Sequence, residues 1–154
     1  MIEFTVQINN NQWSKRVKRI KNIINNVLRY KKDLKFLNNM NYYCNIVLTN
    51  DKIVKSLNKK FKKVNLTTDV LTFVSKQEIK SKKKEKYCDI FFSIETIKKD
   101  AKKNKIEFYT HLTHLIIHSF LHINDYVHDK LEDFVAMKNI EIKILKKLNI
   151  ESPY

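Results

Sequence analysis

The sequence contains no glycine, one proline and two cysteines among its 154 residues. Without glycine it cannot form the glycine-rich loops of Walker-type and dinucleotide-binding motifs, so we expect no nucleotide cofactor. Cys44 and Cys88 are too few for a disulfide scaffold and fit a reduced, cytoplasmic setting. No run approaches 18 apolar residues, so no membrane span is expected. The alternating start at residues 1–6 resembles neither a signal nor a transit peptide.

Positive charge is what the chain has in excess. It carries 31 Lys and Arg against 16 Asp and Glu, a net charge of +15. Because such side chains release counterions from phosphates, this charge favours a nucleic-acid partner. Only Arg16, Arg19 and Arg29 are arginines, however, and asparagine and isoleucine are also abundant. This composition is typical of a gene that has drifted toward A and T, so the charge permits RNA binding without specifying it.

The hydrophobic pattern predicts a single α+β domain over residues 1–154. Apolar alternation and β-branched runs indicate strands at 2–8, 42–48, 69–74 and 90–94. Helical spacing indicates helices at 13–30, 51–63, 95–103, 107–122 and 130–148. The charged stretch 80–86 is expected to be a loop. This order predicts about five helices packed on a mixed four-stranded sheet.

All five histidines lie between residues 111 and 128. His118 and His122 are one turn apart on one face of the predicted helix 107–122, so both rings can bind one cation. A chain that turns back after residue 124 brings His128 to the same ion. Two such histidines alone are more often core residues than ligands, but the third favours a catalytic zinc site at the C-terminal end of this helix. His114 lies one turn before His118 on the same face of the helix. It is a fourth ligand, a residue that contacts a ligand from behind, or a surface residue, and the last two interpretations are favoured.

The spacing of these three histidines also matches zinc proteases of the extended HExxH type. Those enzymes carry a glutamate directly after the first histidine as general base, whereas this chain has Ser119. Peptide hydrolysis by that mechanism is therefore not expected. A base, if one is needed, must come from elsewhere or be the metal-bound hydroxide.

Residues 118–128, HSFLHINDYVH, resemble the signature H-G-x-L-H-L-x-G-Y-D-H of the YbeY family. Three further stretches are similar to family motifs: TDVLTF at 68–73 to T-D-V-L-S-F, CDI at 88–90 to G-D-I, and NKKFK at 58–62 to N-x-x-[YF]-R. The segments occur in the family's order and cover roughly residues 45–150. The three-histidine signature is the specific part, because the strand motifs alone are weak.

The resemblance implies a single-strand-specific, zinc-dependent endoribonuclease that acts in ribosome assembly and in maturation of small-subunit ribosomal RNA. Its partners would then be ribosomal RNA and the small ribosomal subunit. One zinc per chain is implied on His118, His122 and His128. Lys62 matches a family arginine that contacts RNA phosphate. Asp89 matches an acid that orients a ligand or water, and a buried structural carboxylate is an equally open interpretation of it.

The sequence departs from the family pattern around these sites. Ser119 and Asp125 replace glycines, and we expect a left-handed backbone at Asp125. Val127 replaces an acid, for which Asp129 is a candidate substitute. Lys62 keeps the charge of the family arginine but lacks its bidentate fork. These losses leave an alternative function, a non-catalytic RNA-binding assembly factor with a structural zinc site.

Overall fold

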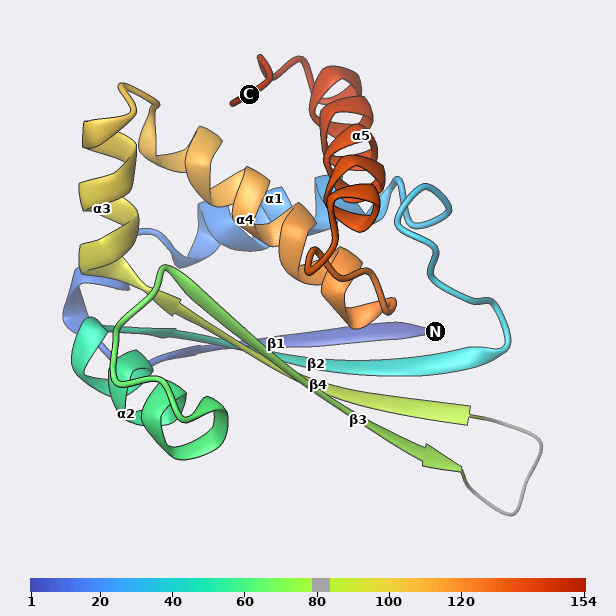
Figure 1. Ribbon diagram of the computed structural model, residues 1–154, viewed down its shortest axis with the longest axis horizontal. Coiled ribbons are helices and arrows are strands. Elements are labelled where there is room, and N and C mark those ends of the chain that lie inside the picture. Colours follow the sequence, from blue (N-terminus) through green and yellow to red (C-terminus); the bar gives the residue numbers. More distant parts are fainter. Residues whose placement is uncertain (79–83) are drawn as a thin grey trace.

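A computed structural model describes residues 1–78 and 84–154 of the chain (Figure 1). Its sheet has the strand order β1-β2-β4-β3. The β1/β2 and β2/β4 pairs are parallel, and β3 runs antiparallel to β4. The strands are β1 (Ile2–Ile8), β2 (Met40–Thr49), β3 (Val70–Glu78) and β4 (Lys84–Ser93). The predicted mixed four-stranded sheet is confirmed.

Five α-helices accompany this sheet in the described part of the chain, as predicted. They are α1 (Val17–Leu28), α2 (Asp51–Lys62), α3 (Ile94–Lys103), α4 (Phe108–Ile123) and α5 (Leu131–Lys147). Among the described residues, none of these helices combines the length and apolar character needed to cross a bilayer. The order of elements agrees with an α+β domain.

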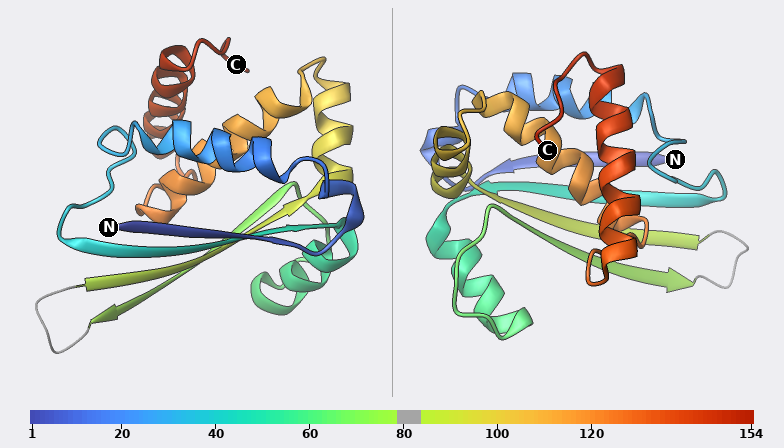
Figure 2. Two further views of the ribbon diagram at one scale, coloured as in Figure 1. Left: turned by 180° about the vertical axis from the view of Figure 1, so that it is seen from behind. Right: turned by 45° about the horizontal axis from the view of Figure 1, so that its top comes forward.

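The two faces of the sheet have different partners. Alternation along β4 buries Cys88, Ile90 and Phe92, while Asp89 between them is exposed on the opposite face. Figures 1 and 2 show α1, α4 and α5 over one face and α2 against the other. Helix α4 is the centre of the core and is apolar almost all round, because it packs against α1, α3, α5 and β3.

Helix α2 is fixed on the far face by its caps and by aromatic packing. The Asn50 side chain accepts a hydrogen bond from the backbone N–H of Ile53 at 3.1 Å, which caps the first turn. Phe61 packs edge-on against Phe73 of β3, with ring centroids 5.5 Å apart. The helix ends at Lys62, so this lysine is presented at the edge of the sheet formed by β3.

Two predicted boundaries are wrong. The helix predicted from residue 13 begins at Val17, because Trp13 belongs to a separate 3-10 turn, η1 (Asn11–Trp13), and its indole donates to the carbonyl of Thr49 at 2.8 Å. The loop predicted at 80–86 ends earlier, since β4 begins at Lys84; residues 80–83 lie outside the described residues. Lys86 is only 2% exposed, because its Nζ donates to the carbonyl of Ile123 at 2.6 Å.

Candidate metal centre

The end of α4 and the turn after it bring three histidines together. His118 and His122 lie in the last two turns of α4. Asp125 then takes a left-handed backbone with φ 69°, as predicted, and the chain folds back toward His128. The ring centroid of His128 lies 5.4 Å from that of His118 and 4.9 Å from that of His122. One ring nitrogen from each lies within 4.8 Å of the others, so these three side chains can hold a metal ion.

Hydrogen bonds orient two of the rings. His118 Nδ1 lies 2.7 Å from Glu141 Oε1, and His122 Nδ1 lies 2.8 Å from the carbonyl oxygen of Tyr126. A carboxylate and a carbonyl only accept hydrogen bonds, so both Nδ1 atoms carry the hydrogen. The Nε2 atoms therefore offer their lone pairs, and they lie 2.9 Å apart. This is the orientation that histidine ligands of a metal ion adopt.

Glu141 lies in α5 and is only 1% exposed. Its carboxylate links two of the histidines to Tyr154 through hydrogen bonds. Its Oε2 is 2.6 Å from His114 Nε2 and accepts a hydrogen bond from the Tyr154 hydroxyl at 2.6 Å. Burial alone would raise the pKa of Glu141, but hydrogen bonds from His114, His118 and Tyr154 lower this pKa to about 2. A buried negative charge therefore stands directly behind His118.

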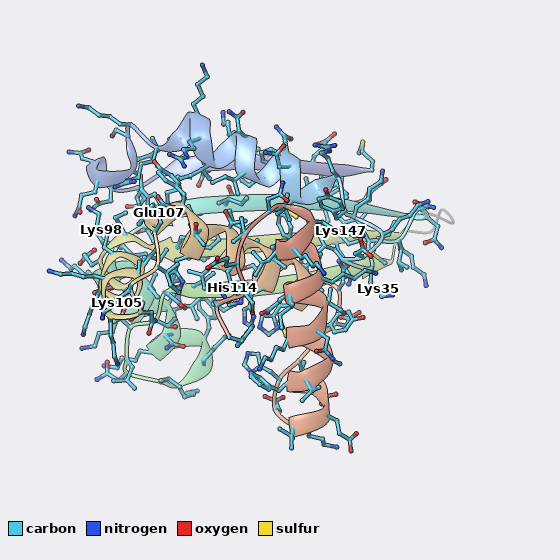
Figure 3. All side chains as sticks on the ribbon, turned by 90° about the horizontal axis from the view of Figure 1, so that it is seen from above. Lys35, Lys98, Lys105, Glu107, His114 and Lys147 are labelled. Atoms are coloured by element: carbon cyan, nitrogen blue, oxygen red, sulfur yellow. The ribbon has the colours of Figure 1, made fainter. Side chains whose placement is uncertain are left out.

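This network decides between the roles considered for His114. Its Nε2 is engaged by Glu141 and lies 3.3 Å from the Tyr154 hydroxyl. His114 therefore stands behind the ligand His118 and shares its carboxylate, and it is not one of the three converging rings. In Figure 3 it lies beside α5.

Burial sets the protonation of His122. Burial and then the neighbouring His118 lower the pKa of His122 to about 4, and the positive charge of Lys62 acts in the same direction. His122 is therefore neutral near pH 7. Since a histidine must be unprotonated to bind a metal, no proton has to leave this ring at neutral pH.

The three histidines line a groove of about 960 Å³. The groove runs between the end of α4, the turn after it, strand β3 and the end of α2, and Lys62 and Asp129 also line it. In Figure 3, Lys98 and Lys105 lie at one end of the molecule, and Lys35 and Lys147 lie toward the other. None of these four lysines lines the histidine groove.

Asp89 is not brought together with these residues. It is exposed on the far face of β4, where Asn45 Nδ2 donates to its Oδ1 at 3.3 Å. It does not line the histidine groove. Its predicted role in orienting a ligand or water therefore gains no support from its position.

Two further positions bear on the chemistry. Ser119 is fully buried and its hydroxyl donates to the carbonyl of Leu115 at 2.8 Å, so it cannot serve as a base for the metal site. Glu141, which contacts His118, was not among the site residues predicted from the sequence. The sequence does carry one sign of its burial, because this charged residue lies between the buried residues Met137 and Ile144 on the apolar face of the last helix.

Known proteins are similar to this chain along nearly its whole length. The family model described as endoribonuclease YbeY matches residues 7–149. Endoribonuclease YbeY of Ehrlichia canis (strain Jake) is 33% identical over 162 residues, which cover 100% of this chain and 97% of that protein. That of Pelagibacter ubique (strain HTCC1062) is 35% identical over 147 residues, 95% of each chain. The solution structure of TM1509 from Thermotoga maritima shares the fold, with a TM-score of 0.54 and 21% identity over 97% of this chain and 92% of that one. The resemblance seen in the sequence is thus confirmed, and the chain belongs to the YbeY family of endoribonucleases.

Proposed function

We propose that this chain is a zinc-dependent endoribonuclease that cuts single-stranded RNA, acting in the cytoplasm in ribosome assembly and in maturation of small-subunit ribosomal RNA. One observation carries the proposal: His118 and His122 present their Nε2 lone pairs to one point beside His128, inside an open groove. Membership of the YbeY family supports RNA as the substrate. The ribosomal RNA and the small ribosomal subunit are proposed as partners from the sequence resemblance.

The donor set fits zinc. Two nitrogens that each lie 2.0–2.1 Å from one zinc ion at the tetrahedral angle are about 3.3 Å apart. The two Nε2 atoms lie 2.9 Å apart, so a small side-chain movement is enough. Three protein ligands leave a fourth position for water or substrate, as in catalytic zinc sites. Zinc bound there supplies Lewis acidity toward a phosphoryl oxygen and lowers the pKa of a bound water.

The protein's own groups have separate tasks around such an ion. Glu141 holds the His118 ring in its ligating tautomer, and the carbonyl of Tyr126 does the same for His122. Lys62 lines the groove and binds an RNA phosphate as a point charge, without the two-pronged geometry of an arginine. The family signature has an acid at the position of Val127. Asp129 lines the same groove and supplies an acid in its place. The part given to Asp89 stays a prediction from the resemblance.

Metal analysis and RNA cleavage test this proposal. The wild-type protein is expected to hold zinc at the histidines and to cut single-stranded ribosomal RNA until a chelator is added. His118→Ala and His122→Ala should each lose that zinc and the cleavage. Lys62→Ala should keep the zinc and cut less, while Lys18→Ala, an exposed lysine on α1, should change neither.

Two results would contradict the proposal in different ways. Full zinc occupancy of the histidine site in both His118→Ala and His122→Ala would refute the site. A wild-type protein that holds zinc and binds ribosomal RNA tightly, yet shows no chelator-sensitive cleavage, would refute the enzyme. That second result would favour the alternative, a non-catalytic assembly factor with a structural zinc.

A further inference from the structure

A second group of metal-ligand side chains lies beside the first turn of α4. Asp69 directly precedes β3, Asp100 is in α3 and His111 is in α4. One ligand atom from each lies within 4.8 Å of the other two. The three residues thus meet in space from three separate elements. None of them belongs to the histidine site described above.

The two carboxylates of this group, Asp69 and Asp100, accept few hydrogen bonds from the described part of the protein. Asp69 Oδ1 accepts hydrogen bonds from the backbone N–H of Val70 at 2.7 Å and from the Thr68 hydroxyl at 3.2 Å. The Asp100 carboxylate has no hydrogen bond or ion pair among residues 1–78 and 84–154. Although the chain has a net charge of +15, neither acid has a lysine partner in the described structure. Two like charges this close repel unless a cation joins them.

His111 supplies the second, independent observation. It is 9% exposed, and its Nε2 is buried without a hydrogen-bond partner in the described part of the chain. A buried nitrogen without a hydrogen-bond partner is unfavourable, so such an atom calls for a ligand. Burial lowers the pKa of His111, with His114 acting in the same direction against the two acids. The ring is therefore neutral near pH 7 and offers a lone pair rather than a positive charge.

We propose that Asp69, Asp100 and His111 form a second divalent-cation site, separate from the three-histidine site. One imidazole and two carboxylates suit Zn²⁺ or Mn²⁺, whereas Ca²⁺ and Mg²⁺ prefer oxygen ligands alone. Donor atoms that share one tetrahedral zinc ion lie about 3.3 Å apart, and those of this group lie within 4.8 Å of one another, so at most a small movement of the side chains is needed. The carboxylate of Asp100 can move inward without breaking a bond in the described structure.

The second site is too far from the first for the two ions to share a reaction step. His111 and His118 are seven residues apart on α4, which at 1.5 Å per residue separates them by about 10 Å along the helix axis. Two-metal mechanisms need ions about 4 Å apart. Asp69 and His111 nevertheless line the same groove as the three histidines. A cation there neutralises Asp69 in the groove wall and Asp100 behind it and, on the proposed function, favours binding of the RNA backbone.

Counting bound zinc on the full-length protein tests the second site by itself. At a modest excess of Zn²⁺, the wild type is expected to hold two ions per chain after gel filtration. His122→Ala should hold one, at the second site, and Asp100→Asn should hold one, at the three histidines. The double variant should hold none, and Asp133→Asn, a matched change on α5, should still hold two.

Melting temperatures with and without added metal show whether the variants are folded and bind the ion at the second site. Added Mn²⁺ or Zn²⁺ should raise the melting temperature of His122→Ala, and this rise should disappear when Asp100→Asn is added to it. One ion in the wild type together with none in His122→Ala would overturn the second site and leave the proposed function intact. Two ions retained by Asp100→Asn would overturn it as well. Loss of cleavage with two ions still bound concerns the proposed function alone.

Discussion

Replacing Glu141 by glutamine tests how far the metal site depends on a residue that touches no metal. The two carboxylate oxygens of Glu141 accept three hydrogen bonds, from His118 at 2.7 Å, His114 at 2.6 Å and Tyr154 at 2.6 Å. Glutamine keeps the shape but offers one acceptor oxygen and an NH₂ group that donates. The NH₂ group then faces either the His118 donor or the two donors of His114 and Tyr154. If the NH₂ group faces His118, the ring must move its hydrogen to Nε2, which is the atom needed for the metal.

The size of the effect follows from the burial of this carboxylate. Glu141 is 1% exposed and its pKa is about 2 instead of 4.5, which corresponds to about 3 kcal/mol in favour of the ionised form. We expect Glu141→Gln to lower the stability of the metal-free protein by up to about 3 kcal/mol. Loss of a carboxylate behind a histidine ligand typically weakens metal binding 10–100-fold, or about 1–3 kcal/mol.

Competition with a chromophoric chelator at pH 7.5 measures the zinc affinity, and urea unfolding of the metal-free protein measures stability. Glu3→Gln is the matched control, because Glu3 is exposed on β1 and the chemical change is the same. Glu141→Asp keeps the charge and should recover part of the affinity. If Glu141→Gln binds zinc at the histidines within twofold of the control, the carboxylate does not tune the ligand and the reasoning fails.

Four further outcomes are expected. Lys62→Arg should lower the KM for RNA severalfold in steady-state cleavage with zinc content unchanged, because a guanidinium binds phosphate through two hydrogen bonds. Ser119→Gly should lower the free energy of unfolding in urea by about 0.5 kcal/mol, since glycine is less favourable than serine inside a helix. Lys86→Met should cost about 1–3 kcal/mol in the same assay, because it leaves the carbonyl of Ile123 without its buried partner. Metal-free protein should lose stability as the pH falls from 6.5 toward 4: the unfolded chain protonates His122 at its ordinary pKa of 6.5, whereas the folded chain does so only at about 4. Urea midpoints at pH 7, 5.5 and 4.5 measure this loss, and His122→Ala should flatten it.

The sequence predicted those parts of the fold that depend on local periodicity. The histidine helix is predicted at 107–122 and spans Phe108–Ile123, because its apolar residues recur at helical spacing up to a clear break. Trp13 misled the prediction for the first helix, since its apolar side chain fits the stripe of α1 although its indole is anchored to β2. The charge of Lys84–Lys86 predicts a loop, whereas strand pairing with β2 and β3 extends β4 beyond its apolar core and includes these residues.

The candidate site was predictable to the extent that its residues are neighbours in sequence. His118, His122 and His128 fall within eleven residues, so one helix and one turn bring them together. Glu141 comes thirteen residues after His128, and its contact with His118 exists only because α5 packs on α4. Asp100 meets His111 in the same way, through the packing of α3 on α4. Contacts of this kind depend on tertiary structure, for which a single sequence carries no direct signal.

The turn that delivers His128 shows how a chain without glycine builds a site whose family signature contains it. Asp125 takes φ 69°, a conformation that costs most residues about 1–2 kcal/mol but aspartate less. The same residue lies 3.4 Å from the buried Lys86 ammonium, which also holds the carbonyl of Ile123 at 2.6 Å. One lysine on β4 thus ties the last turn of α4 and the left-handed residue to the sheet. The backbone freedom that glycine would give is replaced by a charged anchor, so the position of His128 depends on Lys86, a residue far from the signature in sequence.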